Sequence, residues 1–507
     1  MGMDRRSSTP IFPLFTLLIS LCIGFTATAF GAVPGNGTSE EKILLPELGS
    51  PSDQYLTPAD EARLGRAFMQ SILETQPVLD DPLITEYIQT LGNRLLNKSE
   101  AAGQEYRFFV IEEPMINAFA GPGGHIGIYT GLILATQSES ELASVIAHEI
   151  AHVTQKHLLR AFDAANRMSG KTAVLMLAAI LVGIAGSTDA GIALASGVQA
   201  GALQEQINFT RSNEQEADHV GIKILADADL DPRSMPVFFE RLTHANRLFD
   251  TGIPEVLRTH PVTTNRIADA LGRAETYSYK QYSSDLRYFL TRETLRMRQF
   301  EKSDEAVEHF RSGLEEGRYL NKEAHQFGFV LALTRDRNFP AANKLVTELL
   351  KKRPDQVEYI LAEANIAKES GGRQKAMRSL ETAHTLLPDS YPVTIAYSEI
   401  LLEAGEAEEA KKTIDQARTF RPNDPRLFRL LAKAEEKLKN SAQSHRLLAE
   451  AYVAEGKLGA AIQQLDIALK QKETQDFYQS SQIEARLREL KALKKLEDTK
   501  QKRSDDF

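Results

Sequence analysis

Three hydrophobic patterns follow one another along the chain. Residues 11–25 are apolar almost throughout, whereas residues 58–98 contain two stretches with the helical period. Residues 106–130 are typical of short strands joined by a glycine-rich turn, and helical patterns return at residue 138 and continue in pairs beyond about residue 280. A mixed first part and a purely helical second part predict an α+β fold, mostly α, with two folded domains.

The first apolar segment has the layout of a secretory signal peptide. Two arginines precede it and small residues end it at 26–29, so we expect cleavage after Ala29 and export of the mature chain. The apolar run is short for a membrane span and contains Pro13, which makes an uncleaved anchor the less favoured alternative. Cys22, the only cysteine, lies in this segment, so the mature chain has none with which to form a disulfide.

One helical segment carries a metal-binding motif. Within residues 138–158, which we interpret as one helix, His148 and His152 are four positions apart and share a face, so both rings can bind one metal ion. Glu149 projects from a neighbouring part of that helix, where it can take a proton from water rather than bind the metal. Apolar flanking residues indicate a helix buried on most sides, and two buried histidines need a partner. A surface helix with two solvated histidines is the less favoured alternative.

A second motif follows at residues 214–218. Together, H-E-x-x-H and this E-x-x-A-D resemble the gluzincin superfamily of CAAX prenyl proteases and the heat-shock protease HtpX. The resemblance implies that Glu214 is the third zinc ligand and that Asp218, one turn on, orients a ligating histidine. The choice of Glu214 over Glu216 rests on that resemblance. Glu216 is expected to be structural or solvated, and His219 to be a surface residue.

Two loop stretches are similar to the same family. The N-A-F-A-x-P-G-G stretch precedes strand 125–130, which we expect to be the sheet edge that binds substrate as an added strand, or else part of a purely structural hairpin. The T-H-P-x-x-x-x-R-I stretch contains His260 and Arg266. We hypothesise that His260 reaches the open position of the metal, which would make the resting enzyme latent, or stabilises the tetrahedral intermediate. Arg266 would hold that loop or bind a carboxylate. Ordinary capping and packing are the alternative for both residues.

Composition and one further apolar segment bear on possible partners. The 507 residues carry a net charge of −9, with a pI near 5.8, which gives no footprint of nucleic-acid binding. Residues 172–203 are apolar and rich in small residues, in two halves that are each too short to span a bilayer. A helical hairpin packed over the active site is the favoured interpretation. A segment that makes peripheral contact with a membrane is the alternative.

The second half of the chain is repetitive. Prolines that follow helical stretches recur at intervals of 34 residues, and so does a set of alanines within those stretches. These residues are Pro354, Pro388 and Pro422, and Ala342, Ala376 and Ala410. Three aligned periods resemble the tetratricopeptide repeat, whose helical pairs stack into a curved solenoid with a concave binding face.

The order of these parts resembles the beta-barrel assembly-enhancing protease group. We expect a signal peptide at residues 1–29 and a flexible lead-in at residues 30–50. A zincin-like metallopeptidase domain with a small β-sheet would follow at residues 51–278. An all-α tetratricopeptide-repeat solenoid would span residues 279–495, before a disordered tail at residues 496–507. The resemblance implies a periplasmic endopeptidase with one Zn²⁺ per chain that acts on misfolded or stalled outer-membrane proteins. The solenoid would dock on the substrate or on the barrel assembly machinery.

Two other functions stay open. The first is a repeat-based chaperone or scaffold for outer-membrane assembly with a latent or structural zinc site, although a structural site has no need of a base such as Glu149. The second is an integral membrane protease, against which the short apolar segments argue.

Overall fold

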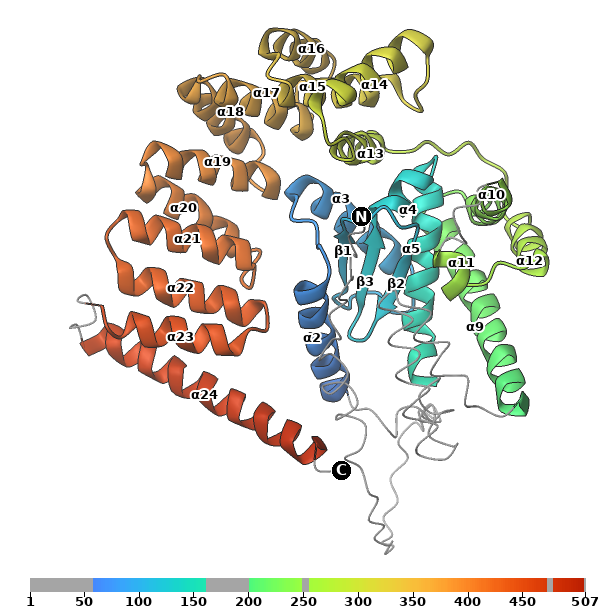
Figure 1. Ribbon diagram of the computed structural model, residues 1–507, viewed down its shortest axis with the longest axis horizontal. Coiled ribbons are helices and arrows are strands. Elements are labelled where there is room, and N and C mark those ends of the chain that lie inside the picture. The colour runs from blue at the N-terminus through green and yellow to red at the C-terminus, as the bar shows by residue number, and fades with distance from the viewer. Residues whose placement is uncertain (1–57, 161–199, 249–254, 472–476, 506–507) are drawn as a thin grey trace, which may run out of the picture.

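We describe the protein from a computed structural model. The structure describes residues 58–160, 200–248, 255–471 and 477–505 (Figure 1). The expected signal peptide and lead-in lie outside the described residues, as does almost all of the apolar segment 172–203. Among the described residues, no helix is long and apolar enough to span a membrane.

The first folded part begins with two helices, as their proline signals predict. Helix α2 spans Pro58–Thr75 and helix α3 spans Pro82–Leu96. The carboxylate of Asp81 caps α3, because it accepts hydrogen bonds from the main-chain N–H groups of Leu83 and Ile84 at 3.0 and 3.2 Å. Proline in the first turn costs nothing there, since the nitrogens of a first turn have no partner within the helix.

Three strands form one small sheet. Strands β1 (Arg107–Ile111), β2 (Ala118–Gly121) and β3 (His125–Tyr129) are arranged in the order β1-β3-β2. Strand β3 pairs with β1 in parallel and with β2 in antiparallel orientation. The turn between β2 and β3 places Gly123 and Gly124 at φ values of 71° and 73°, which glycine adopts without steric cost.

This order makes one sequence-based expectation wrong. The strand at 125–130 was expected to be the edge, but β3 is the central strand and β2 is the edge strand next to the motif helix. The hydrophobic alternation of a strand shows which face is buried, and not which neighbours the strand has. Here β2 and β3 form a hairpin, and the hairpin inserts β3 rather than β2 beside β1.

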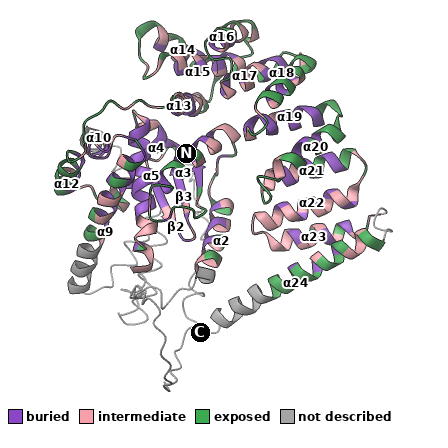
Figure 2. Cartoon of the chain, turned by 180° about the vertical axis from the view of Figure 1, so that it is seen from behind, coloured by how far each residue is buried: buried purple, intermediate pink, exposed green. Residues whose placement is uncertain are grey.

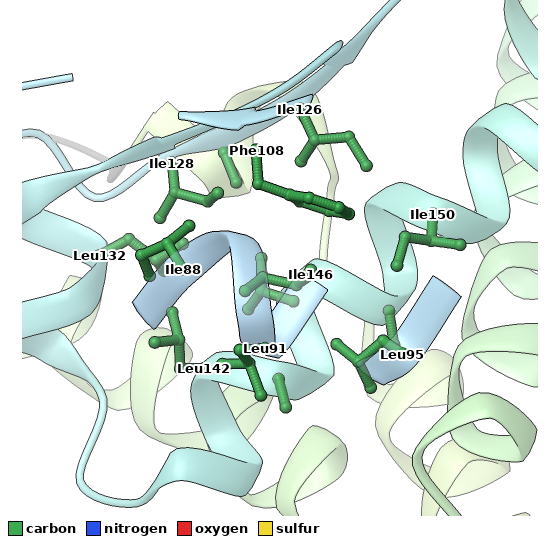
Figure 3. Packing of buried hydrophobic residues seen from close by; sticks show 14 of the residues in the cluster. Ile88, Leu91, Leu95, Phe108, Ile126, Ile128, Leu132, Leu142, Ile146 and Ile150 are labelled. Carbon is green, nitrogen blue, oxygen red and sulfur yellow. The ribbon is translucent and has the colours of Figure 1, made fainter. Parts of the chain in front are cut away.

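The core of this part lies between the sheet and two helices. Helix α4 (Thr130–Ala135) follows β3, and helix α5 (Glu139–Thr154) carries the H-E-x-x-H motif. Figure 3 shows side chains of α3, the sheet and α5 packed together, among them Leu91, Phe108 and Ile146. Helix α5 is buried from Glu139 to Ala151, as its apolar flanks predict (Figure 2).

The motif helix is shorter than expected. It ends at Thr154, the next two residues form a turn, and residues 157–160 are helical again. Lys156 in that turn has a left-handed backbone with φ 54°. The expectation of one helix to residue 158 is therefore wrong at its end, because nothing in the sequence at this point is a recognised helix breaker.

In the described ranges, four more helices belong to the first part. They are α9 (Ala200–Asp227), α10 (Ser234–Leu248), α11 (Glu255–Thr259) and α12 (Thr264–Ala274). Helix α9 packs along α5, and α10 and α12 pack around this pair.

Pairs of helices form the second part. They are α13 (Leu286–Arg298), α14 (Ser303–Glu316), α15 (Lys322–Arg335), α16 (Phe339–Lys352), α17 (Val357–Glu369), α18 (Arg373–Leu386), α19 (Tyr391–Ala404), α20 (Ala407–Arg418), α21 (Pro425–Lys437), α22 (Ser441–Ala454), α23 (Leu458–Ala468) and α24 (Phe477–Asp505). The periodic alanines Ala342, Ala376 and Ala410 are fully buried on α16, α18 and α20. Their small side chains let successive helices approach closely, which explains the period.

The solenoid curves around the first part (Figure 1). Its helices α13 and α19 contact α3, so the repeats begin and continue against the same helix. Arg287 of α13 donates to Glu86 of α3 at 3.1 Å, and Arg426 of α21 donates to Asp80 at 3.0 Å. These polar contacts join residues more than 200 positions apart.

Candidate metal centre

Four side chains from three segments meet inside the first part. His148 and His152 lie on α5, Glu214 lies on α9, and His260 follows directly after α11. One ligand atom from each of them lies within 4.8 Å of all the others. His148 Nε2 is 3.0 Å from His152 Nε2 and 3.4 Å from Glu214 Oε2, and His152 Nε2 is 3.4 Å from Glu214 Oε1.

Small residues bring the two motif helices together. Ala147 and Ala217 are fully buried, and Gly221 of α9 faces the main chain of α5. A Cβ atom added at Gly221 would lie 3.3 Å from the main-chain nitrogen of His148, which is tighter than ordinary contact. The close approach of the two backbones places Glu214 opposite the two histidines.

The cluster has the spacing and chemistry of a zinc site. Ligand atoms at the corners of a tetrahedron with bonds of about 2.0–2.1 Å lie roughly 3.3 Å apart. The two histidine nitrogens are 3.0 Å apart, and each lies 3.4 Å from one oxygen of Glu214, Oε2 for His148 and Oε1 for His152, which is close to that edge length. Two imidazole nitrogens and a carboxylate are also the ligand set of catalytic zinc, so the residues fit the ion that the motif predicts.

His260 adds a fourth possible donor beside these three. Its Nδ1 atom is 3.4 Å from His148 Nε2 and 2.9 Å from Glu214 Oε1. Its other ring nitrogen, Nε2, is 3.7 Å from Glu149 Oε1. The ring therefore stands between the three-residue cluster and the motif carboxylate.

Glu149 is almost fully buried beside the cluster. Among the described residues its Oε1 atom has no hydrogen-bond partner. Burial raises the pKa of Glu149, an effect that His260 and His148 oppose. The main chain of Ala120, on the edge strand β2, also hydrogen-bonds to this carboxylate. A buried carboxylate with a raised pKa and a free oxygen is suited to accept a proton.

A carboxylate and an arginine support one side of the cluster. Asp218 Oδ1 lies 3.0 Å from His148 Nδ1, and Arg266 donates to both Asp218 oxygens at 2.7 and 2.8 Å. Arg266 also lies 2.9 Å from Glu214 Oε2 and donates to the main-chain oxygen of Pro261 at 2.9 Å. Burial alone would raise the pKa of Asp218, but the contacts with Arg266 and His148 lower it. Arg266 thus does both things that the sequence suggested, since it holds the loop and binds a carboxylate.

A second support lies on the other side, and the sequence did not predict it. His157 Nδ1 is 2.9 Å from His152 Nδ1, and His157 Nε2 is 3.2 Å from Glu216 Oε2. Arg160 donates to both oxygens of Glu216, at 2.7 and 3.3 Å. In a continuous helix His157 would lie about 140° around the axis from His152, too far to contact it. The contact therefore depends on the break at Lys156, which the sequence does not signal.

Glu216 and His219, which were not expected to bind the metal, have structural surroundings. Glu216 pairs with Arg160 and His157, in keeping with a structural carboxylate. His219 lies at the surface, where it pairs with Asp269 and Arg273 of α12. Its side chain is one-third exposed, as expected for a surface residue.

Comparison with known proteins places this geometry in a family. Residues 82–274 match the sequence model of Peptidase family M48, and residues 367–434 match that of the tetratricopeptide repeat. The beta-barrel assembly-enhancing protease of Escherichia coli K12 is 31% identical over 480 residues, which cover 94% of this chain and 96% of the relative. The chain belongs to the beta-barrel assembly-enhancing protease family. A Vibrio cholerae relative named for the same activity is 38% identical over 350 residues, which cover 69% of this chain and 70% of the relative.

Membership of this family confirms two of the expectations from sequence. The beta-barrel assembly-enhancing protease fold, a peptidase domain followed by helical repeats, is the one that the patterns predict. Peptidase family M48 is a zinc-dependent metallopeptidase family, and the chain is a metalloprotease. The metalloendopeptidase OMA1 of Danio rerio mitochondria is also similar, at 30% identity over 207 residues, which cover 40% of this chain and 43% of the relative.

Proposed function

We propose that this protein is a periplasmic zinc metalloendopeptidase that hydrolyses misfolded or stalled outer-membrane proteins during outer-membrane assembly. The observation that carries the chemistry is the set of three donors at tetrahedral spacing, with the buried carboxylate of Glu149 beside them. The names of the bacterial relatives support the connection with barrel assembly. The segment at residues 1–29 supports export.

In this proposal the three donors hold one ion and the motif carboxylate moves the proton. His148, His152 and Glu214 bind Zn²⁺, and Asp218 orients the ring of His148 through Nδ1. When bound, zinc supplies a Lewis acid that activates the attacking water and the scissile carbonyl. Glu149 takes the proton of that water and later delivers it to the leaving amine. The position of Glu149, buried directly beside the three donors, suits both steps.

The substrate in this proposal lies along β2. Strand β2 is the edge of the sheet, and the hydrogen bond between Ala120 and Glu149 places it directly beside the proposed base. A peptide added as a strand at this edge gains main-chain hydrogen bonds with little dependence on its sequence. Such binding suits an enzyme that must accept many unfolded chains.

In the resting protein, the side chain of His260 blocks access of substrate to the metal site. Its Nδ1 atom lies beside His148 and Glu214 and its Nε2 atom is 3.7 Å from Glu149, so its ring fills the space that water and the scissile carbonyl need. Cleavage in this proposal requires the loop after α11 to move. Arg266 opposes that movement, because it joins the loop to Asp218 and to Glu214.

The same closed geometry favours one other function, a chaperone or scaffold with a latent zinc site. In both functions the solenoid would bind outer-membrane substrates or the barrel assembly machinery. A substrate-trapping experiment separates them. In cells that express Glu149→Gln in place of the wild type, stalled barrel precursors should accumulate and co-purify with the variant. Equal precursor levels in wild-type and Glu149→Gln cells would refute the protease function and leave the chaperone.

A further inference from the structure

We propose that His157 is a positioning residue of the metal site, which fixes the tautomer and the orientation of His152. This inference rests on the proposed function, in which His152 binds zinc. The motif assigns no role to His157, which lies beyond its last residue. Its side chain is nevertheless buried, and its ring packs edge-on against that of His152 with centroids 4.8 Å apart.

The direction of each hydrogen bond follows from the chemistry of imidazole. A neutral ring has one N–H and one lone pair, and the ligating nitrogen must offer its lone pair. The Nε2 atom of His152 faces His148 and Glu214, so its proton must be on Nδ1. His157 Nδ1, at 2.9 Å, must then accept this proton in a hydrogen bond.

The next contact agrees with that assignment. If His157 accepts at Nδ1, its own N–H is at Nε2, where Glu216 Oε2 lies at 3.2 Å. A carboxylate can only accept, so the chain from His152 through His157 to Glu216 has one consistent set of donors and acceptors. That set is the one in which His152 Nε2 is free to bind a metal.

The local backbone is shaped for this contact. Helix α5 stops at Thr154, and Lys156 takes a left-handed conformation that a residue with a Cβ atom rarely adopts. The turn directs the side chain of His157 back toward the end of helix α5, where His152 lies. Backbone strain of this kind persists where the surrounding structure requires it, which is common at functional sites.

The two ligating histidines are supported by matching arrangements. His148 meets Asp218 directly, and Arg266 holds that carboxylate. Glu216, two residues before Asp218 on α9, is held by Arg160 and contacts His157 rather than a ligand. His157 therefore positions His152 as Asp218 positions His148. Glu216 in turn holds His157, as Arg266 holds Asp218.

Zinc affinity of the full mature chain tests this role without any measurement of cleavage. His157→Phe keeps the ring and removes both nitrogens, and we expect it to weaken zinc binding by roughly 10–100-fold in competition with a chelator. His157→Asn keeps an acceptor close to the position of Nδ1 and should restore most of the affinity. His219→Phe, a matched change at the surface histidine of α9, should leave affinity unchanged.

Stability of the metal-free proteins separates positioning from folding. The inference requires His157→Phe and His157→Asn to melt alike without metal and to differ in zinc affinity. Wild-type affinity in His157→Phe would overturn it, and so would equal losses of affinity in the Phe and Asn variants. If His157→Phe does not fold, Glu216→Leu, which removes the oxygens that accept from His157 and Arg160, gives the same test, and unchanged affinity there overturns the role. A wild type that binds no zinc would instead refute the proposed function.

Discussion

His260 Nδ1 lies 2.9 Å from Glu214 Oε1, although the two residues are 46 positions apart in the chain. Glu214 is held from the other side by Arg266, which also binds the main chain next to His260. The loop after α11 is thereby tied to the metal cluster at two points. Its position decides whether the space beside the three donors is filled, and the first prediction follows from this.

Replacement of His260 by alanine should raise activity. The other three donors keep their positions, so His260→Ala should retain zinc while the space beside them opens. If the wild-type site is open about one-tenth of the time, cleavage of an unfolded protein should rise roughly tenfold. Initial rates and zinc content should be measured on the same samples. Unchanged activity with unchanged zinc affinity would exclude any role for His260. Lower activity with zinc retained would instead favour stabilisation of the tetrahedral intermediate.

Arg266 should be essential for stability. It is buried and faces both Asp218 and Glu214, so Arg266→Met leaves two buried carboxylates with less compensation. Removal of one partner from a buried ion pair costs about 3–5 kcal/mol in the free energy of unfolding, which urea denaturation measures.

Arg273 provides the control for this variant. It lies on the same helix, α12, and pairs with the surface residue His219. Arg273→Met should lower the unfolding free energy by less than about 1 kcal/mol, as is usual for exposed charges. Similar losses in the two variants would show that Arg266 contributes only as any residue of this helix does.

Two helical glycines should respond in opposite ways to alanine. A Cβ atom at Gly92 of α3 would lie 2.4 Å from the nearest ring atom of Phe108, in the core that Figure 3 shows. Gly92→Ala should therefore destabilise the protein by about 1–3 kcal/mol. Nothing lies within 4 Å of the corresponding position at Gly272 of α12, where alanine should stabilise the helix by about 0.5–1 kcal/mol. Thermal melts of the two variants would be inconsistent with the described packing if both shifted in the same direction.

Zinc should stabilise the fold as well as support catalysis. His148 and Glu214 are buried, so without zinc their side chains are shielded from water and lack the metal ion that would bind them. This lowers the stability of the metal-free protein. Chelation should lower the melting temperature, and added zinc should restore it by mass action. Glu149→Gln should respond to zinc as the wild type does, whereas His148→Ala should not respond. A melting temperature of the wild type that is independent of zinc would contradict the proposed ligand set.

The features that were predicted from sequence are those encoded within a short stretch. The spacing of His148 and His152 identified a metal motif, and Pro82 marked the start of a helix. The 34-residue period identified the repeats, because each repeat contacts its neighbours in the same way. In the first two cases the decisive residues lie within a turn or two of one another, and in the third they recur at one fixed interval.

The features that were missed depend on pairings between distant residues or on a local break. The order of β2 and β3 depends on which strand meets β1, and hydrophobic alternation does not encode it. The contact between His157 and His152 depends on a left-handed Lys156, which no preference of lysine predicts. Arg266 was recognised from its motif, but its simultaneous contacts with Asp218 and Glu214 require three segments to be in place.

Cleavage of an unfolded model protein by residues 30–507, compared with Glu149→Gln, tests the central claim most directly. Glutamine keeps the size of Glu149 but cannot accept the proton of water. We expect that only the wild type cleaves, that zinc removal abolishes this cleavage, and that both proteins bind one zinc ion per chain. Cleavage by Glu149→Gln at the wild-type rate would contradict the proposed base, as would loss of zinc from that variant.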